Sequence, residues 1–205
     1  VAALKAMDAD IYALLEVFGN SSLNDLCTAL NTACQTNQYK YIENSTANQG
    51  MACFIYNSNT VIPFKELQKN RLADNGYLPD RKIAQAFDLK ANNERFIVCL
   101  NHWKAKDNSY NKPDEYADTG DGQGSHVLRR VHEAEATLEF IKTVTAYFED
   151  EDVLVVGDLN SYSKEDPIRV LEEGKLINEL QKYAPNEYSY AFFSNNSYAT
   201  GYLDH

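Results

Sequence analysis

The sequence predicts an α/β domain, and three observations lead to that prediction. The apolar run at 153–156 is too short for a helix and predicts a strand buried on both faces. Apolar residues recur at steps of three and four from Val127 to Phe148, which predicts an amphipathic helix leading into that strand. Alternating segments elsewhere predict hairpins. A length of 205 residues favours one domain over residues 1–205.

The first half of the chain is predicted to alternate helices with short strands. The expected elements are, in order, the end of a helix at 1–8, a strand at 10–16, a helix at about 21–31, a hairpin of 39–42 and 51–56, a strand and loop within 60–80, and a hairpin of 81–89 and 95–100. Ser21 and Ser22 are expected to cap the helix at about 21–31, because their hydroxyls can satisfy exposed amide groups.

The second half is predicted to hold one long loop and several short elements. Residues 107–124 lack periodicity, and a loop of that length in a compact domain is usually functional or mobile. Its Asp118–Gly122 segment lacks the acidic spacing and the closing Glu of an EF-hand, which excludes that site. After the strand at 153–156, Ser163 is expected to cap a short helix that Gly174 ends. Strands are expected at 188–193 and 198–203.

Charge and cysteine content narrow the function classes. The formal net charge of −11 argues against broad electrostatic binding of nucleic acid, but a cation held by carboxylates would still admit a phosphate substrate. No apolar run approaches the roughly 18 residues of a membrane span. Cys53 and Cys99 are expected to be buried thiols. Cys27 and Cys34 can pair only if their helix breaks, so the redox compartment stays open.

Polar side chains follow four of the predicted strands at their ends. They are Glu16, Asn101-His102, Asp158 with Asn160, and Asp204-His205. Gly157 would let the backbone leave its strand, after which Asp158 and Asn160 either point the same way in extended backbone or form an Asx turn. Glu16 is either simply exposed or bound to a metal ion. The joint occurrence predicts a polar cleft rimmed by strand ends.

With these motifs the sequence resembles the endonuclease/exonuclease/phosphatase superfamily, the DNase I-like proteins. The motifs are Leu15-Glu16-Val17, Asn101-His102-Trp103-Lys104, Gly157-Asp158-Leu159-Asn160 and Leu203-Asp204-His205. Further segments resemble the branch of secreted bacterial nucleases, namely Gly120-Asp121-Gly122-Gln123-Gly124 with Arg130, Lys164-Glu165-Asp166-Pro167 and Arg81-Lys82-Ile83-Ala84. The resemblance implies a four-layer sandwich of two stacked mixed sheets flanked by helices. It also implies hydrolysis of phosphodiester bonds with Mg²⁺ or Mn²⁺, and with Ca²⁺ as a further candidate.

The resemblance also implies roles for single residues. The metal ligands would be Glu16, Asp158 and Asp204. Asp158 would deprotonate the attacking water that Asn160 fixes, and His102 would donate near the leaving oxygen. His205 would stabilise charge on the phosphoryl oxygens, with Asp204 setting its tautomer. The substrate-binding residues would be Asn101, Tyr56 and Arg130.

Three departures from the family pattern bear on substrate choice. Asn57 stands where the secreted branch commonly shows Arg, Val127 stands where that branch places Asn, and the family's first and last strands lack counterparts in residues 1–205. Two other functions therefore compete with a secreted or periplasmic, monomeric nuclease acting on DNA or RNA. One is a phosphatase or phosphodiesterase for small or lipid-linked esters. The other is a non-catalytic binding module. Stacking aromatics, for which Trp103 and the fourteen tyrosines are candidates, would favour nucleic acid.

Overall fold

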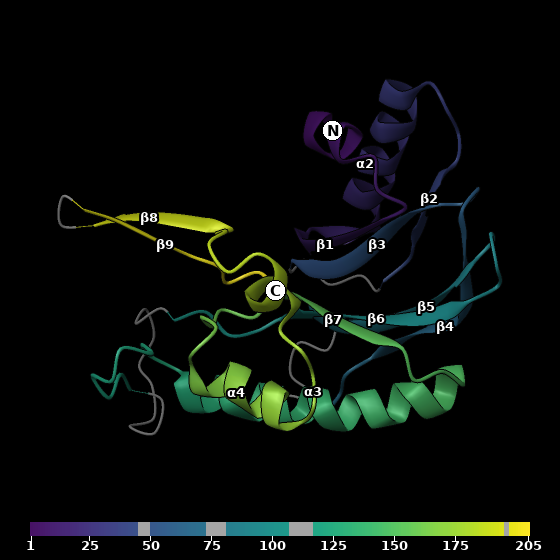
Figure 1. The fold of residues 1–205 in the computed structure, drawn as a ribbon. Helices are drawn as coiled ribbons and strands as arrows, with labels where there is room; N and C mark the ends of the chain where they lie inside the picture. The colour runs from purple at the N-terminus through teal and green to yellow at the C-terminus, as the bar shows by residue number, and fades with distance from the viewer. Residues whose placement is uncertain (45–49, 73–80, 107–116, 195–196) are drawn as a thin grey trace. The chain divides into compact units, whose positions relative to one another are not determined.

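The computed structural model describes residues 1–44, 50–72, 81–106, 117–194 and 197–205, with residues 190–200 described by their backbone alone (Figure 1). The chain divides into two compact units. The first unit contains residues 1–70, the described part of 78–101, and 141–157. The second unit contains the described parts of 71–77 and 102–140, with residues 158–205. The loop predicted at 107–124 lies outside the described residues over 107–116, as do parts of the loops predicted around 43–50 and 70–80.

The first unit holds two β-sheets. The strands are β1 (Ile11–Val17), β2 (Tyr39–Ile42), β3 (Met51–Asn57), β4 (Val61–Lys69), β5 (Lys82–Leu89), β6 (Arg95–His102) and β7 (Val153–Asp158). Their orders are β1-β3-β2 and β4-β5-β6-β7. The pairs β1–β3, β2–β3, β4–β5 and β5–β6 are antiparallel, which confirms both predicted hairpins. β7 instead runs parallel to β6, because Ile97 N–H donates to Asp152 O and Trp103 N–H donates to Asp158 O, so the partners advance together.

The two sheets share an apolar core, which confirms the predicted class of stacked sheets with helices outside. Phe54 of β3 and Phe87 of β5 are fully buried in it, with ring centroids 5.7 Å apart and edge-to-face geometry. Residues of β6 complete this core, among them Val98 and Leu100.

The helices α1 (Ala2–Met7) and α2 (Gly19–Cys34) pack against the three-stranded sheet through a second core that includes Leu23, Leu30 and Tyr39. The predicted cap of α2 is wrong. The helix begins at Gly19 after Phe18, and the Ser22 hydroxyl donates to Phe18 O instead of accepting from an amide. Because α2 continues unbroken to Cys34, Cys27 and Cys34 do not pair, and all four cysteines are free.

The strand β7 also departs from its prediction. The side chain of Leu154 is 51% exposed, so β7 is not buried on both faces. The reason is its position at the end of the sheet order, where β6 is its one neighbour among the described strands.

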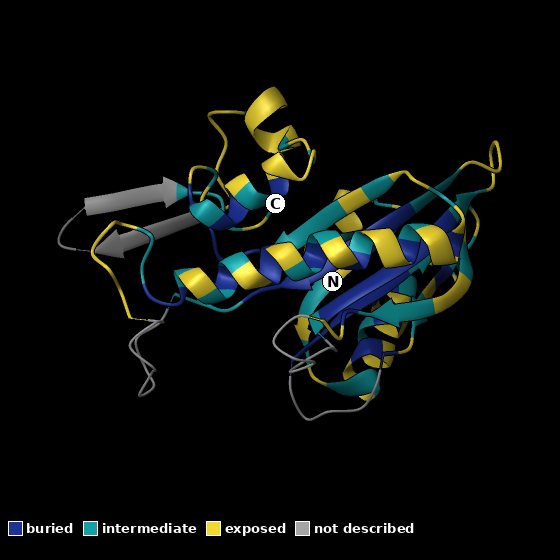
Figure 2. Ribbon diagram, turned by 90° about the horizontal axis from the view of Figure 1, so that it is seen from below, coloured by how far each residue is buried: buried dark blue, intermediate teal, exposed yellow. Residues whose placement is uncertain are grey.

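The second unit is built around helices. It contains residues 127–140 of α3 (Val127–Phe148), then α4 (Asp166–Glu173), α5 (Glu179–Tyr183), and the antiparallel pair β8 (Tyr190–Ser194) and β9 (Ser197–Gly201). Trp103, Leu159 and Ile168 lie in its apolar core. Figure 2 shows α3 with one exposed and one buried face, as its period predicts.

The ends of α4 test two further predictions. Gly174 ends α4 as expected, but Glu165 rather than Ser163 stands at its first cap position. Among the helices that the structure describes, none combines the length and the apolar character that a bilayer span requires.

Candidate active site

The ends of β6 and β7 bring the predicted polar residues His102 and Asp158 together. The strands are parallel, so their carboxyl ends reach the same edge of the sheet. Gly157 has a φ of +128°, and a Cβ built there would lie 2.0 Å from Asn101 O. The φ confirms the predicted need for glycine at this strand end, and the close approach to Asn101 is a second reason for it.

Asp158 occupies an Asx turn, one of the two conformations that the sequence left open. Its Oδ1 accepts the N–H of Asn160 at 2.9 Å, and Asn160 has a left-handed φ of +49°. The Oδ2 atom lies 3.8 Å from His102 Nε2. The His102 side chain is 9% exposed and that of Asp158 is 29% exposed. A carboxylate open to solvent therefore lies beside a buried imidazole.

The amide of Asn160 is already engaged. Its Nδ2 donates to Trp103 O at 3.0 Å, and the side chain is buried. This bond ties the turn after β7 to the backbone that follows His102. The Trp103 ring is itself buried at 1% exposure in the core of the second unit, so it is not available to stack on a base. Burial therefore removes Trp103 from the candidates for base stacking.

Asp204 and His205 reach the turn after β7 through backbone pairing. Asp158 and Asp204 are partners in an antiparallel bridge, and Leu159 N–H donates to Leu203 O at 2.9 Å. The Asp204 side chain is exposed, whereas His205 is half-buried. Five predicted residues, His102, Asp158, Asn160, Asp204 and His205, thus belong to the second unit.

The imidazole of His205 has a defined hydrogen-bond role. Its Nε2 lies 2.8 Å from Ser161 O, and a carbonyl oxygen only accepts, so Nε2 carries the hydrogen. Its ring also packs edge-to-face on Tyr202 at a centroid distance of 4.8 Å. Burial lowers the pKa of His205, although the bond to Ser161 and the Asp204 charge oppose that shift. The neutral ring therefore presents Nδ1 as an acceptor.

Glu16 belongs to the first unit, near the end of β1. It is exposed, and its φ of +58° lies where the pairing of β1 with β3 shifts register between Leu14 and Val17. Gly50 packs against this bulge, since a Cβ built there would be 3.0 Å from Glu16 Cα. Arg81 Nε in turn donates to Gly50 O at 3.1 Å. These contacts hold the backbone of Glu16 in its left-handed conformation.

The three predicted substrate-binding residues differ in exposure. Asn101 is buried, and its Nδ2 donates to Cys99 O at 3.2 Å. The ring of Tyr56 is half-buried at 6.1 Å from that of Phe87, and burial raises its pKa. Arg130 is fully buried, and its guanidinium donates to the backbone oxygens of Gln123, Ser125 and Lys104.

Sequence reasoning missed several residues that hold this part of the second unit together. Glu133 Oε2 accepts the N–H of Lys104 at 2.8 Å. Lys106 pairs with Glu165, and its ammonium lies 4.3 Å from the centroid of the Tyr162 ring. No motif signals such pairs, because they join residues from separate segments of the sequence.

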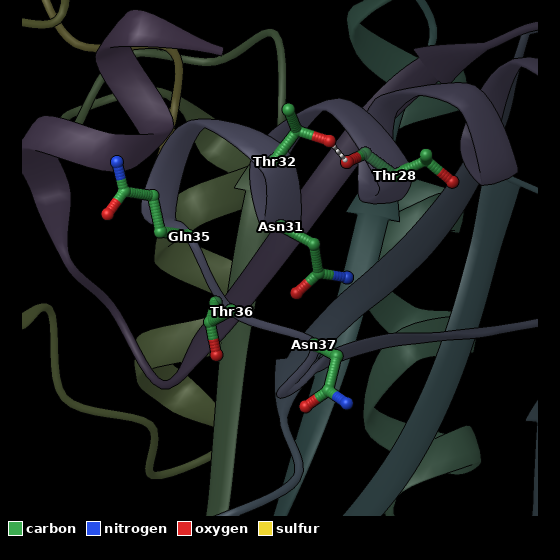
Figure 3. A pocket seen from close by; sticks show the side chains of 6 residues that line it. All are labelled: Thr28, Asn31, Thr32, Gln35, Thr36 and Asn37. Carbon is green, nitrogen blue, oxygen red and sulfur yellow. Dashed lines mark hydrogen bonds between the residues drawn. The ribbon is translucent and has the colours of Figure 1, made fainter.

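A polar hollow lies elsewhere, at the C-terminal end of α2 (Figure 3). Its lining side chains are uncharged, and they are Thr28, Asn31, Thr32, Gln35, Thr36 and Asn37. The Asn31 amide bonds the backbone of Tyr39 in both directions. None of the predicted catalytic or metal-binding residues lines the hollow.

Two of the three predicted metal ligands, Asp158 and Asp204, are brought together by backbone pairing. Asp158 and Asp204 stand directly opposite each other in their bridge, where like charges destabilise pairing unless something neutralises them. Carboxylate oxygens are the ligands that Mg²⁺ and Mn²⁺ prefer. Among the described residues no cluster of three or more His, Cys, Asp or Glu is assembled. The fit therefore rests on the Asp158–Asp204 pair.

Comparison with known proteins identifies the fold. An endonuclease/exonuclease/phosphatase family protein from Bacteroides thetaiotaomicron is 18% identical with a TM-score of 0.67, covering 100% of this chain and 70% of that one. Mannosyl-6-phosphatase of the same organism is 17% identical with a TM-score of 0.66, covering 100% of this chain and 72% of that one. TDP2 of D. rerio, solved with a single-strand DNA product, is 13% identical with a TM-score of 0.58, covering 99% and 72% respectively.

These likenesses show that the chain has the DNase I-like fold of the endonuclease/exonuclease/phosphatase proteins. No protein-family model matches the chain, and no curated protein sequence matches it.

Proposed function

We propose that this chain, which has the DNase I-like fold, is a divalent-metal-dependent enzyme that hydrolyses phosphodiester bonds in DNA or RNA. The observation that carries the proposal is the setting of Asp158. Its carboxylate lies at a strand end, 3.8 Å from the His102 imidazole and opposite Asp204 in a backbone bridge. A proton acceptor, a proton donor and paired oxygen ligands are the groups that phosphoester hydrolysis requires.

Asp158, Asp204 and Glu16 would hold the cation. Mg²⁺ or Mn²⁺ would neutralise charge on the phosphate and polarise its oxygen when bound. Ca²⁺ is a further candidate for the same oxygen ligands. Glu16 lies in the first unit and the two aspartates lie in the second. The role of Glu16 as a metal ligand is therefore a separate prediction with its own test.

The chain's own groups would move the protons. Asp158 would accept a proton from the attacking water as its oxygen bonds to phosphorus. The bond from phosphorus to the leaving oxygen breaks, and His102 would protonate that oxygen. His102 suits this role better than His205, because His102 Nε2 lies 3.8 Å from Asp158 Oδ2 whereas His205 Nε2–H already donates to Ser161 O. Asn160 would fix the turn that carries Asp158.

A second candidate is a phosphatase or phosphodiesterase for small or lipid-linked esters. The buried Trp103 and the net charge of −11 favour it, since neither offers a surface for nucleic acid. Mannosyl-6-phosphatase is also among the similar structures. The secreted-nuclease motifs and the likeness to a protein solved with single-strand DNA favour the first candidate.

Hydrolysis of four substrates tests the proposal: plasmid DNA, RNA, bis(p-nitrophenyl) phosphate and p-nitrophenyl phosphate. Each is assayed with Mg²⁺, Mn²⁺, Ca²⁺ or EDTA. Cleavage of DNA or RNA that EDTA abolishes is expected. Turnover of the monoester without cleavage of nucleic acid would replace the first candidate by the second. Absence of turnover on all four would contradict both and leave a binding module.

Glu16→Gln tests the shared ion. Calorimetric titration with Mn²⁺ should show about a tenfold loss of affinity, because a ligand charge is removed. Glu43→Gln is the matched control, since Glu43 is also an exposed glutamate of the first unit. Equal affinity in both variants would remove Glu16 from the metal site.

We also propose that the protein is monomeric and acts outside the bacterial cytoplasm, in line with the secreted branch that its motifs resemble. Gel filtration tests the first point. Detection of the protein in the medium or periplasm rather than in the cytoplasmic fraction tests the second.

A further inference from the structure

The backbone that follows His102 is held by two buried side chains of α3. Glu133 Oε2 accepts the N–H of Lys104 at 2.8 Å, and Arg130 Nη1 donates to Lys104 O at 3.4 Å. Arg130 is 0% exposed and Glu133 is 1% exposed. They stand three residues apart, so they share one face of the helix. The backbone N–H and C=O of Lys104 are thus both hydrogen-bonded by side chains of α3.

Arg130 joins the same backbone to the loop before α3. Its guanidinium donates to Ser125 O at 2.8 Å and to Gln123 O at 2.9 Å. The Gln123 side chain then closes on Asp166 at the start of α4, accepting its N–H at 2.7 Å and donating to its Oδ2 at 2.8 Å. A continuous set of hydrogen bonds therefore runs from α4 through Gln123 and Arg130 to Lys104, two residues after β6.

Burying the charged groups of Arg130 and Glu133 costs desolvation free energy, so their presence in the interior requires an explanation. Burial lowers the pKa of Arg130, while Glu165 and Glu133 oppose that shift. Apolar side chains of similar volume often stabilise a core as well as a buried ion pair does. Apolar side chains, however, cannot form hydrogen bonds that fix the backbone N–H and C=O of Lys104.

The backbone of Trp103, between Lys104 and the proposed proton donor His102, is also hydrogen-bonded. Trp103 N–H donates to Asp158 O at 2.9 Å, and Trp103 O accepts from Asn160 at 3.0 Å. With Lys104 held by Arg130 and Glu133, the backbone N–H and C=O groups of both Trp103 and Lys104 are hydrogen-bonded. His102 directly precedes this fixed segment, and its imidazole faces Asp158 at 3.8 Å.

We propose that Arg130 and Glu133 are positioning residues that orient His102 toward Asp158 through the backbone of Lys104. Only the kinetic part of the test rests on the proposed function, because it requires the protein to hydrolyse a substrate. It assigns to Arg130 a role other than binding substrate, because a fully buried guanidinium bonded to three carbonyls has no face toward solvent.

The test compares Arg130→Lys, Glu133→Ala and Glu133→Gln with the wild type. Lysine keeps the charge but cannot reach several carbonyls at once. Glutamine keeps an oxygen acceptor for Lys104 N–H, and alanine removes it. Arg169→Lys is the matched control, because Arg169 is an arginine of the same unit whose ion pair with Asp166 is exposed. Two readouts are taken: kcat and KM separately, and the ring resonances of His102 by NMR. The chain has four histidines, so a His102→Gln spectrum assigns them.

The proposal expects kcat to fall about 100-fold in Arg130→Lys and Glu133→Ala with KM unchanged, as for a slightly misplaced catalytic group. The His102 resonances should shift in both variants, and Glu133→Gln should restore them toward the wild type. A rise in KM with kcat unchanged would show that Arg130 contacts substrate, which overturns the proposal. Unshifted His102 resonances in both variants overturn it as well.

The two readouts separate this inference from the proposed function. Should the wild type hydrolyse none of the substrates, the His102 resonances alone decide whether Arg130 and Glu133 position that ring. Should Arg130→Lys fail to fold, the comparison of Glu133→Ala with Glu133→Gln decides.

Discussion

The two units of the molecule bury different kinds of side chain. In the first unit the buried set is mainly apolar, and Phe54, Phe87 and Ile55 are fully enclosed. In the second unit the buried set includes Arg130, Glu133 and many other polar groups. These others are His102, Ser125, His126, Thr137, Asn160, Ser161 and Glu165. The proposed proton donor and acceptor, His102 and Asp158, both belong to the unit rich in buried polar groups.

This difference indicates which buried positions should tolerate substitution and which should not. Apolar packing depends on volume and shape, so a residue of similar size can replace another at modest cost. A buried polar group needs a specific partner, and losing that partner leaves a desolvated donor or acceptor. We therefore expect the first unit to respond to lost volume and the second to lost partners.

The largest effect is expected at Asp158. Replacing it by asparagine should lower turnover about 1000-fold, because the base is lost while the Asx-turn acceptor for Asn160 N–H is kept. Steady-state rates on bis(p-nitrophenyl) phosphate measure it. Asp150→Asn is the control, since Asp150 Oδ1 accepts the N–H of Asp152 in an equivalent turn. Equal losses in the two variants would contradict the assignment of Asp158 as base.

Loss of volume in the first unit should produce the next largest effect. Phe87→Ala should lower the free energy of unfolding by about 3–5 kcal/mol, since it empties a fully buried site between the sheets. Urea denaturation followed by far-UV circular dichroism measures it. Leu154→Ala is the control, because that side chain is 51% exposed and should cost far less. Trp103 is the single tryptophan and lies in the second unit, so its fluorescence reports whether the second unit unfolds together with the first.

A smaller loss is expected where β6 meets β7. Gly157→Ala should lower the free energy of unfolding by about 2 kcal/mol, because the added Cβ meets Asn101 O at 2.0 Å and φ is +128°. The same denaturation experiment measures it. Gly50→Ala, where the nearest backbone atom is 3.0 Å away, should cost less. The reverse order would mean that the two strands separate easily at this end.

The smallest effect is expected from pH at His205. Burial lowers its pKa below the ordinary 6.5, so the unfolded chain takes up the proton more readily. The contribution to stability is complete above pH 6.5 and is lost as the pH falls through the lowered pKa. The wild type should therefore lose stability more steeply than His205→Gln on acidification from neutral pH, as measured by urea denaturation at several pH values. Parallel curves would show that the ring is open to solvent.

The local sequence pattern predicted more of the first unit's structure than of the second unit's. The hairpins of β2 with β3 and of β5 with β6 follow from alternation and short connections, and the fold class was confirmed. The extent of α3 was also predicted from its period. The exposure of Leu154 was not, because an apolar run does not reveal whether its strand lies at the end of a sheet.

The polar network of the second unit could not be predicted from spacing. The expected apolar stripe of α3 holds at Ala134 and Val144, but Arg130, Glu133 and Thr137 are buried in its first half. From the sequence alone, these polar residues would be assigned to the solvent-exposed face of the helix. Only contact with the segment after His102 and with the loop before the helix makes them interior. Strand-end motifs named the candidate residues, whereas the groups that hold them came from tertiary contacts.

The pairing of Leu159 with Leu203 has a consequence for biosynthesis. Synthesis runs from the N-terminus, and the domain's earlier strands can pair while later residues are still being added. Asp204 and His205 contact residues more than 40 positions upstream, at Asp158 and Ser161. A nascent chain that has not yet released residues 203–205 from the ribosome therefore lacks part of the proposed cation and phosphate site, so hydrolytic competence would arise only after these residues have emerged.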